Sequence, residues 1–151
     1  MRLVELRQID ADNLEDVLSL AVSDDQTTFV STVAQSLAQA WVYRDTAFPF
    51  AIYADGAPVG FVMLGYYESR DQYTLWKFLI DARYQRRGYG RAALLLAIDR
   101  LAETFGAREI YTGVLLGNEV ARRLYASVGF VETGLIEDNM REMRYDIKTV
   151  G

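Results

Sequence analysis

The sequence of 151 residues contains neither cysteine nor histidine. Without cysteine the chain forms no disulfide bond and has no thiolate nucleophile. Without histidine it lacks the most common general base and metal ligand of proteins, which excludes every Ser-His or Cys-His catalytic arrangement. We therefore expect no metal centre, and we expect a carboxylate, a tyrosine or a water molecule to carry any proton transfer.

Long hydrophobic runs and targeting signals are also missing. No apolar run is long enough to cross a membrane, and the first residues lack the charged and then apolar pattern of a secretory signal. We therefore expect a cytoplasmic protein that does not bind membranes. The formal net charge of −5 disfavours nucleic acid as a partner and would attract a small cationic substrate. Length and composition predict one globular domain over residues 1–151.

The start of the chain shows one strand pattern and two helix patterns. Residues 1–8 alternate apolar and polar side chains, as a half-buried strand does. Asp10 or Asp12 can cap a short helix that follows. Helical spacing then predicts a second helix over Thr28–Ala40, with Trp41 on its buried face.

The middle of the chain predicts three consecutive antiparallel strands. Two apolar runs, Phe48–Ala54 and Pro58–Tyr66, flank the hairpin signal Asp55-Gly56-Ala57. The turn Glu68–Asp71 leads into a third apolar run over Leu75–Asp81. These connections are too short for crossovers, so neighbouring strands must run antiparallel.

The second half predicts two helices and three strands, so the fold class is α+β. A strand–helix–strand crossover makes the first of these strands parallel to the one before the helix. Gly106 ends the first helix, and the second has Asn118 as its N-cap and Gly129 as a left-handed C-terminal cap. The elements expected are a helix over Arg91–Phe105, a strand over Glu109–Gly113, a helix over Glu119–Val128, strands around Phe130–Thr133 and Arg141–Ile147, and a connection at Glu137-Asp138-Asn139.

A basic, glycine-containing loop joins the third strand to the long helix. A helix start carries free N–H groups and a partial positive charge, and glycine lets an anion approach the main chain closely. The pattern therefore predicts a phosphate or pyrophosphate site, with a simple helix start and solvated arginines as the alternative. The loop residues are Arg86, Arg87, Gly88, Tyr89 and Gly90, followed by Arg91.

Two other phosphate-binding motifs fit this loop less well. The pattern Gly88-x-Gly90-x-x-Ala93 matches a Rossmann fingerprint, but it lies in the middle of the chain. The next strand, Glu109–Gly113, also lacks the acidic residue that such a site needs at its C-terminal end. The Gly-Lys-Ser/Thr sequence of a P-loop is absent.

Two segments resemble a known family. Gln85-Arg86-Arg87-Gly88-Tyr89-Gly90 resembles the Gln/Arg-x-x-Gly-x-Gly/Ala motif of the GCN5-related N-acetyltransferases (GNAT), which bind acetyl-CoA. Asn118-x-x-Ala121-x-x-Leu124-Tyr125-x-x-x-Gly129-Phe130 is similar to a later helix of that family. The resemblance covers essentially the whole chain. It implies a mixed, mostly antiparallel seven-stranded sheet with splayed central parallel strands and about four flanking helices.

Shorter segments resemble the bacterial spermine/spermidine acetyltransferases of the small Bacillus type. They are Ser31, Ser36-Leu37 with Ala40, Val59-Gly60-Phe61, and Trp76–Asp81 running into Tyr84-Gln85. Members of the wider family act on very different amines with the same fold and cofactor. An aminoglycoside-like antibiotic, a protein amine and a non-catalytic role as an acyl-CoA-binding sensor therefore remain alternatives. Dimers are common in the family, so a homodimer is also expected.

The resemblance assigns roles to particular residues. Tyr125 matches the tyrosine that protonates the departing CoA thiolate, a role that a phenol can fill as a weak acid. A core tyrosine is the structural alternative at this position. The residues expected to bind acetyl-CoA are Phe78, Leu79 and Ile80 through the main chain, Gln85, Arg86, Arg87, Gly88, Tyr89, Gly90 and Arg91 around the pyrophosphate, Asn118 at the pantetheine, and Arg122 at a phosphate.

A polyamine acceptor would need carboxylates along a groove with apolar walls. Without cysteine or histidine a covalent acetyl-enzyme is disfavoured, so direct transfer in a ternary complex is expected. Glu68 and Asp71 are the nearest candidates for the general base, although each is also a plausible loop charge. The expected acceptor-binding acids are Asp24, Asp25, Glu68 and Asp71, with Glu137 and Asp138 also in loops, and the expected apolar walls are Trp41, Tyr66, Tyr67 and Tyr73.

Overall fold

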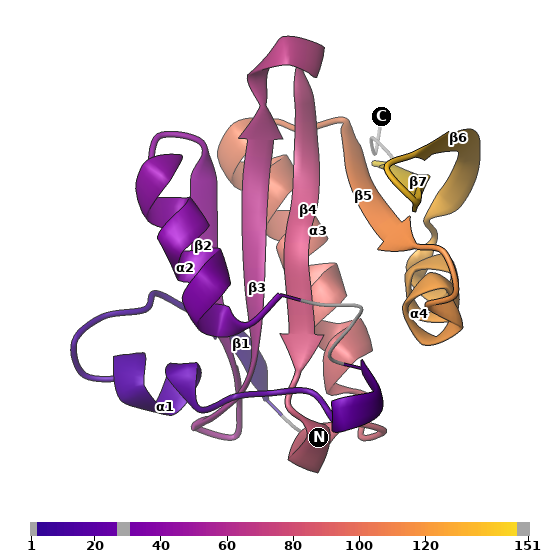
Figure 1. Cartoon of the computed structure of the whole chain (residues 1–151). Coiled ribbons are helices and arrows are strands. Elements are labelled where there is room, and N and C mark those ends of the chain that lie inside the picture. Colours follow the sequence, from indigo (N-terminus) through magenta and orange to yellow (C-terminus); the bar gives the residue numbers. More distant parts are fainter. Residues whose placement is uncertain (1–2, 27–30, 148–151) are drawn as a thin grey trace.

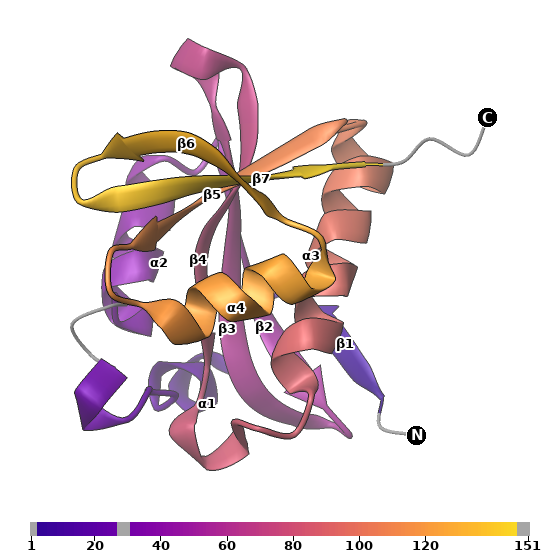
Figure 2. The same ribbon diagram turned by 90° about the vertical axis from the view of Figure 1, so that its right-hand side faces the viewer.

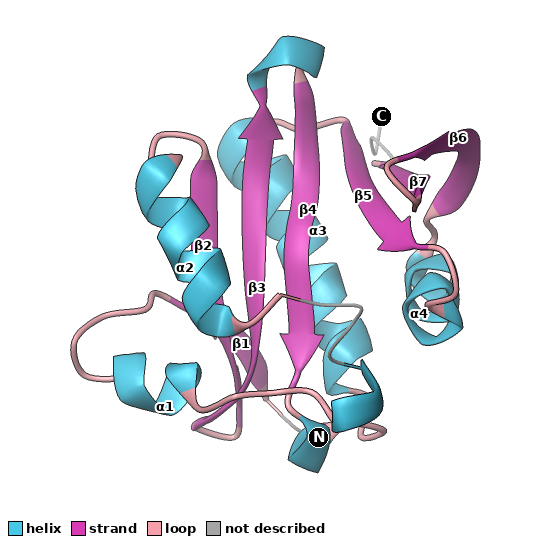
Figure 3. Ribbon diagram, viewed as in Figure 1, coloured by secondary structure: helices cyan, strands magenta, loops and turns pink. Residues whose placement is uncertain are grey.

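One mixed sheet of seven strands organises the chain, which we analysed as a computed structural model that describes residues 3–26 and 31–147 (Figures 1 and 3). The spatial order of the strands is β1-β2-β3-β4-β5-β7-β6. All neighbouring pairs are antiparallel except β4 and β5, which are parallel. The strands are β1 (Val4–Arg7), β2 (Ala47–Ala54), β3 (Ala57–Tyr67), β4 (Gln72–Ile80), β5 (Glu109–Leu115), β6 (Val131–Glu137) and β7 (Met140–Asp146).

In the described part of the chain, four α-helices flank this sheet. The pair α1 and α2 packs on one face, and α3 packs on the other (Figure 1). Helix α4 lies below the hairpin formed by β6 and β7 (Figure 2). The helices are α1 (Leu14–Leu18), α2 (Val33–Val42), α3 (Tyr89–Phe105) and α4 (Glu119–Val128), and the short 3-10 helices are η1 (Asp24–Gln26), η2 (Glu68–Arg70) and η3 (Ala82–Tyr84).

The core is buried on both faces of the central strands. Because side chains alternate along a strand, Val62 and Leu64 of β3 pack toward α3, whereas Phe61 and Met63 pack toward α1 and α2. All four side chains are fully buried. The expected α+β architecture, the three antiparallel strands and the parallel crossover are therefore confirmed. The described residues contain no helix long and apolar enough to cross a membrane.

Helix α2 begins later than the sequence indicated. Its first residue is Val33, and the Thr32 side chain accepts a hydrogen bond from the Gln35 N–H while the Gln35 side chain accepts one from the Thr32 N–H. This reciprocal capping box fixes the start of the helix. The predicted start at Thr28 lies within residues 27–30, which are outside the described part of the chain.

The prediction that Trp41 faces the core was wrong. Its side chain is 70% exposed, and the guanidinium of Arg44 lies over its ring at 4.8 Å. The buried face of α2 contains Val33, Ser36 and Ala40. Trp41 follows Ala40 directly, so it is rotated about 100° from that face.

Three element ends also differ from the predictions. Asn13 occupies the N-cap position of α1, while Asp10 accepts hydrogen bonds from the N–H groups two and three residues later. Gly129 ends α4 with φ of 120° and ψ of 4°, which lies outside the left-handed helical region. Glu137 belongs to β6, so Asp138-Asn139 alone turns the chain, with both φ angles positive.

The parallel strands β4 and β5 separate after a short ladder. In the described chain their paired positions are Tyr73 with Ile110 and Thr74 with Tyr111, after which the strands diverge (Figure 1). The Thr112 hydroxyl donates a hydrogen bond to the Leu75 carbonyl just beyond the last pair. This confirms the splayed central strands that the resemblance implied.

A β-bulge lies in β4 beside this separation. Leu75 pairs with Leu64 and Lys77 pairs with Met63, so Trp76 is the extra residue. A bulge bends its strand and redirects the side chains that follow. Trp76 and Leu79, three positions later, accordingly contact the core under α1 and α2, whereas Leu75 and Phe78 contact the core under α3.

Candidate active site

The loop before α3 is held by hydrogen bonds to two distant segments. The Gln85 side-chain amide donates to the Ile80 carbonyl over 2.9 Å and to the Gln26 side chain over 3.0 Å. The buried carboxylate of Asp81 accepts from the Ala21 N–H over 3.0 Å and from the Arg83 N–H over 2.9 Å. These contacts attach the end of β4 to the segment around η1. Gln85 therefore has a structural role in shaping the loop.

The two glycines of the loop have different functions. Gly88 adopts φ of 83°, and a Cβ there would meet no described atom within 4 Å, so the main chain is accessible at the start of α3. A Cβ on Gly90 would lie 3.3 Å from a methyl group of Leu124. Gly88 thus allows the turn, and Gly90 allows α3 to pack closely against α4.

The arginines of the loop remain at the surface. Arg86, Arg87 and Arg91 are exposed. The Arg87 guanidinium lies 5.6 Å from the centre of the Tyr84 ring, and Arg91 donates a long hydrogen bond of 3.5 Å to the Ser127 carbonyl. The adjacent Tyr89 is different, because its side chain is buried in the core.

A cavity of about 320 Å³ lies where β4 and β5 have separated. It brings together four residues expected at the cofactor, namely Phe78, Leu79, Asn118 and Tyr125. Its wall combines residues from both faces of the sheet, because Leu79 packs under α1 and α2 while Tyr125 packs under α3. We call it the smaller cavity. It lies in the gap between β4 and β5.

Tyr125 is the buried acid of the smaller cavity. Its side chain is 7% exposed, and its ring centre lies 6.4 Å from that of Phe78 and 5.6 Å from that of Phe130. Burial raises the pKa of Tyr125 to about 12, and the nearby Thr112 hydroxyl opposes this effect. The phenol therefore stays protonated at neutral pH and can donate a proton to a reacting atom.

The two other predicted residues of α4 are engaged in local contacts. The Asn118 side-chain oxygen accepts the Ala121 N–H over 3.3 Å, which confirms the predicted N-cap and leaves its amide nitrogen as a donor. Arg122 forms an ion pair with Glu119 and does not line the smaller cavity.

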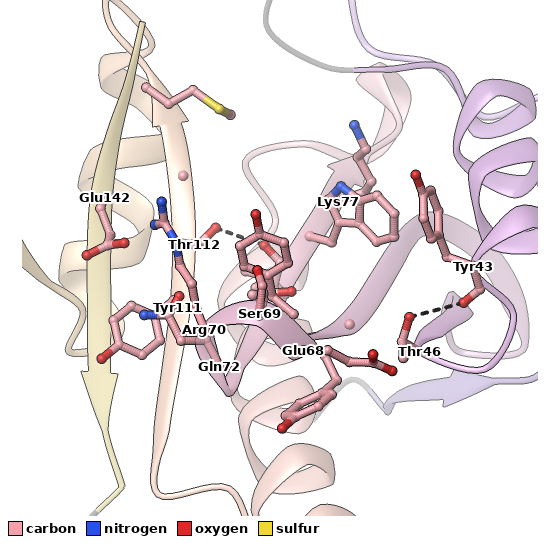
Figure 4. Close-up of a pocket in the computed structure, with 18 of the residues that line it drawn as sticks. Tyr43, Thr46, Glu68, Ser69, Arg70, Gln72, Lys77, Tyr111, Thr112 and Glu142 are labelled. Carbon is pink, nitrogen blue, oxygen red and sulfur yellow. Dashed lines mark hydrogen bonds between the residues drawn. The ribbon is translucent and has the colours of Figure 1, made fainter. Parts of the chain in front are cut away.

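A larger cavity of about 960 Å³ adjoins the smaller one (Figure 4). It lies between α2, η2, β4, β5 and the β6–β7 hairpin. The residues that line both cavities are Trp76, Lys77, Thr112, Gly113 and Met140.

Acidic and aromatic side chains dominate the wall of the larger cavity. Figure 4 shows Glu142 on the β7 side and Glu68 at the η2 end. Arg70 bonds both carboxylate oxygens of Glu137 over 2.9 and 3.2 Å, which connects η2 to β6. The described wall contains the acids Asp45, Glu68, Glu137, Asp138 and Glu142, the cations Arg70 and Lys77, and the aromatic residues Tyr43, Tyr66, Tyr67, Trp76 and Tyr111.

The four predicted acceptor-binding acids do not gather in one place. Glu68 lines the larger cavity. Asp71 accepts the Tyr66 hydroxyl and is not part of the described wall. Asp24 belongs to η1, the turn whose Gln26 contacts the Gln85 loop, and it lines neither cavity. Asp25 is in the same turn, and its side chain is outside the described part of the structure.

The expected apolar walls are also divided. Tyr66 and Tyr67 line the larger cavity, whereas Trp41 and Tyr73 do not. Tyr73 packs instead against Tyr66 and Phe105, with ring centres 4.9 and 5.6 Å away.

Sequence reasoning missed several residues of the described cavity walls, including Asp45, Lys77, Thr112 and Glu142. Lys77 did carry a signal, because it is the single charged residue in the apolar run Leu75–Ile80. Its Nζ donates to the Ser31 hydroxyl over 2.8 Å, and burial lowers the pKa of Lys77. Asp45 and Glu142 have no such signal, because only the folded chain brings them to the cavity.

Residues 14–130 match the model of the Acetyltransferase (GNAT) family. The chain is 30% identical over 145 residues to the spermine/spermidine N(1)-acetyltransferase of Bacillus subtilis, covering 90% of this chain and 93% of that protein. It is 42% identical over 62 residues to the ribosomal protein bS18-alanine N-acetyltransferase of Escherichia coli, covering 41% of each chain.

Solved structures share the fold. The spermidine N-acetyltransferase of Vibrio cholerae, solved in complex with CoA and spermine, superposes with a TM-score of 0.73 at 20% identity, covering 93% of this chain and 92% of that one. An acetyltransferase of Bacillus subtilis in complex with CoA superposes with a TM-score of 0.68 at 19% identity, covering 98% and 100% of the two chains.

Proposed function

The chain belongs to the GNAT family and is an acetyl-CoA-dependent N-acetyltransferase, and we propose that it transfers the acetyl group to a primary amine of spermine or spermidine. The observation that carries this proposal is the larger cavity, whose described wall has five carboxylates against two cations among five aromatic side chains. Carboxylates suit the ammonium groups of a polyamine, and aromatic faces suit both its cations and its methylene chain.

Two comparisons support this choice of acceptor. The relative from Bacillus subtilis, which is similar over nearly the whole chain, is a spermine/spermidine acetyltransferase. The structure from Vibrio cholerae contains spermine together with CoA. The geometry of the two cavities suggests which residues of this chain would bind the acceptor and the cosubstrate.

The loop and the smaller cavity fit acetyl-CoA. The accessible main chain at Gly88 and the N-terminus of α3 would bind the pyrophosphate, with Arg86, Arg87 and Arg91 adding charge. The edge of β4 that β5 leaves unpaired, from Phe78 to Ile80, would hold the pantetheine through its main chain. Asn118 would donate its amide to the pantetheine. Arg122 would reach a phosphate only by exchanging its partner Glu119.

The proposed chemistry is direct transfer between the two cavities. The acceptor amine enters from the larger cavity and loses its proton to a carboxylate of that cavity or to water held by one. The amine nitrogen then attacks the acetyl carbonyl, and a free N–H of β4 stabilises the developing oxyanion. The C–S bond breaks, and Tyr125 donates its proton to the departing sulfur.

The test is a thiol-release assay with acetyl-CoA and a panel of amines: spermine, spermidine, putrescine, an aminoglycoside and lysine-containing peptides. We expect turnover that is selective for spermine or spermidine. Turnover with only the aminoglycoside or the peptides would overturn the polyamine assignment, while leaving the family and the cosubstrate unchanged. Tight binding of acetyl-CoA with no turnover on any amine would overturn the acceptor proposal and favour a sensor.

A further inference from the structure

Lysine is rare in this chain, and one lysine lies beside the proposed reaction centre. The sequence has sixteen basic residues, of which Lys77 and Lys148 are the lysines and the others are arginines. An arginine guanidinium stays protonated in proteins, so it cannot act as an acetyl acceptor in the way an amine can. Lys77 is therefore the sole lysine amine among the described residues 3–26 and 31–147.

The position of Lys77 follows from the bulge in β4. Lys77 comes directly after the bulged Trp76 and directly before Phe78, on the strand proposed to hold the pantetheine. It lines both the larger and the smaller cavity, and the smaller cavity also contains Tyr125. Its amine thus lies at the junction through which an acceptor must reach the acetyl group.

The surroundings of the Lys77 amine favour its neutral form. Its Nζ donates to the hydroxyl of Ser31 over 2.8 Å, and within the described chain no carboxylate forms an ion pair with it. Partial burial removes water from the ammonium and lowers its pKa. A lysine amine that loses its proton more readily is a better nucleophile.

We propose that the enzyme acetylates its own Lys77 when no acceptor amine occupies the larger cavity. This inference rests on the proposed position of acetyl-CoA. The Nζ lone pair forms a C–N bond with the acetyl carbonyl carbon, the C–S bond breaks, and its electron pair leaves on sulfur. Sulfur takes a proton from Tyr125, the proton lost from Nζ passes to water, and water restores the Tyr125 proton. Lysine and acetyl-CoA thereby give acetyl-lysine and CoA without any change in oxidation state.

Acetylation of Lys77 would change the junction in two ways. It removes one of the two cations from the described wall of the larger cavity, leaving Arg70 as the other. It also places an uncharged acetamide where both cavities meet, which narrows the path of a polyamine. The modified enzyme should therefore turn over its acceptor more slowly, so the reaction would limit activity after a period without acceptor.

The experiment incubates the full chain with acetyl-CoA in the absence of any amine. Intact-mass and tryptic-peptide spectrometry then follow acetylation at Lys77, with Lys148 of the same molecule reporting uncatalysed acetylation. We expect Lys77 to react at least about tenfold faster than Lys148, because the site brings amine and thioester together. The rate constant should not depend on protein concentration, and added spermidine should suppress the modification.

Two variants sharpen the test. Lys77→Arg keeps the positive charge and should gain no acetyl group at position 77. Ser31→Ala removes the hydroxyl oxygen that accepts a hydrogen bond from the Lys77 amine. Because the amine is then no longer held by that bond, we expect Lys77 to react several-fold faster in this variant. Equal acetylation of Lys77 and Lys148 would overturn the proposal, because it would indicate uncatalysed chemistry.

The outcome also separates this inference from the proposed function. Unmodified Lys77 together with rapid acetylation of spermidine would overturn self-acetylation alone. Rapid acetylation of Lys77 with no turnover of any amine would support self-acetylation and overturn the polyamine acceptor.

Discussion

The Thr112 hydroxyl donates a hydrogen bond to the Leu75 carbonyl over 3.0 Å, one position beyond the last ladder pair of β4 and β5. A side chain thus continues the pairing where the main chains begin to separate. The bond is buried, and it lies where the opening between the strands begins. That opening contains the smaller cavity and Tyr125.

Replacing this hydroxyl should weaken both the fold and the site. Thr112→Val keeps the shape of the side chain but leaves the buried Leu75 carbonyl without its partner, which costs about 1 to 2 kcal/mol. We expect urea unfolding at a lower midpoint and weaker binding of acetyl-CoA. Thr112→Ser is the control, because it retains the hydroxyl and should keep most of the binding. Equal midpoints for the Val variant and the unmodified protein would contradict the role assigned to this bond.

The two ends of α3 offer a matched test of the phosphate site. Gly88 and Gly106 have positive φ angles of 83° and 68°, and at neither would a Cβ meet a described atom within 4 Å. Alanine at either position should therefore cost a similar backbone strain of about 1 kcal/mol. We expect Gly88→Ala alone to raise the Kd for CoA in calorimetry. A similar rise in Gly106→Ala would mean that general destabilisation, rather than the loop, controls binding.

Tyr125 should also make the stability of the protein depend on alkaline pH. Burial raises its pKa from 10.0 to about 12, so the folded chain keeps the phenol protonated at pH values where the unfolded chain loses the proton. This contribution is complete below pH 10 and is lost as the pH rises toward 12, by about 3 kcal/mol in total. Urea unfolding at several pH values should show a larger loss in the unmodified protein than in Tyr125→Phe, which still contains Tyr66 and Tyr111, whose pKa values are raised by their hydrogen bonds to Asp71 and Glu109. Parallel curves for the two proteins would show that the phenol is not held in its protonated form.

The same substitution tests the proposed acid. Tyr125→Phe removes the proton donor while keeping the ring that packs between Phe78 and Phe130. We expect kcat to fall about 100-fold or more, with the Kd for acetyl-CoA nearly unchanged. A Phe variant with full turnover would leave Tyr125 as a core residue only.

Local sequence signals predicted most of the fold because they act over a few residues. The Asp55-Gly56 turn, the N-cap at Asn118 and the helix end at Gly106 depend on their own backbone, and all three form as expected. Trp41 was misplaced because the exact rotation of α2 depends on the capping box at Thr32 and Gln35. A shift of one residue in such a helix turns a side chain from core to solvent.

The acceptor side of the site could not be predicted in the same way. Asp45, Glu68 and Glu142 come from three segments separated by many residues, and their meeting depends on the sheet order and on the β6–β7 hairpin. The acids Asp24 and Asp71 looked equivalent to Glu68 in sequence, because all three lie in loops. Their contacts differ only once the chain is folded.

Glu142 offers the sharpest test of the acidic cavity. It pairs in register with Gly113, which lines both cavities, so Glu142 lies next to the junction where we propose that the reacting amine arrives. Its carboxylate lines the larger cavity and accepts a hydrogen bond from the Thr133 hydroxyl over 2.8 Å. We expect Glu142→Gln to lower kcat/KM for spermidine about tenfold, because a hydrogen bond between two charged groups contributes about 1.5 to 3 kcal/mol.

Glu132→Gln is the matched control for this prediction. Glu132 lies on the same hairpin and is ion-paired with Arg141, yet it lines neither cavity. Its substitution should change kcat/KM for spermidine by less than about twofold, as expected for an exposed ion pair. Raising the ionic strength should reduce kcat/KM in the unmodified protein more than in Glu142→Gln, because salt screens the attraction that the variant has already lost. Equal losses in the two variants would mean that the hairpin as a whole, and not the charge at the junction, determines how the acceptor binds.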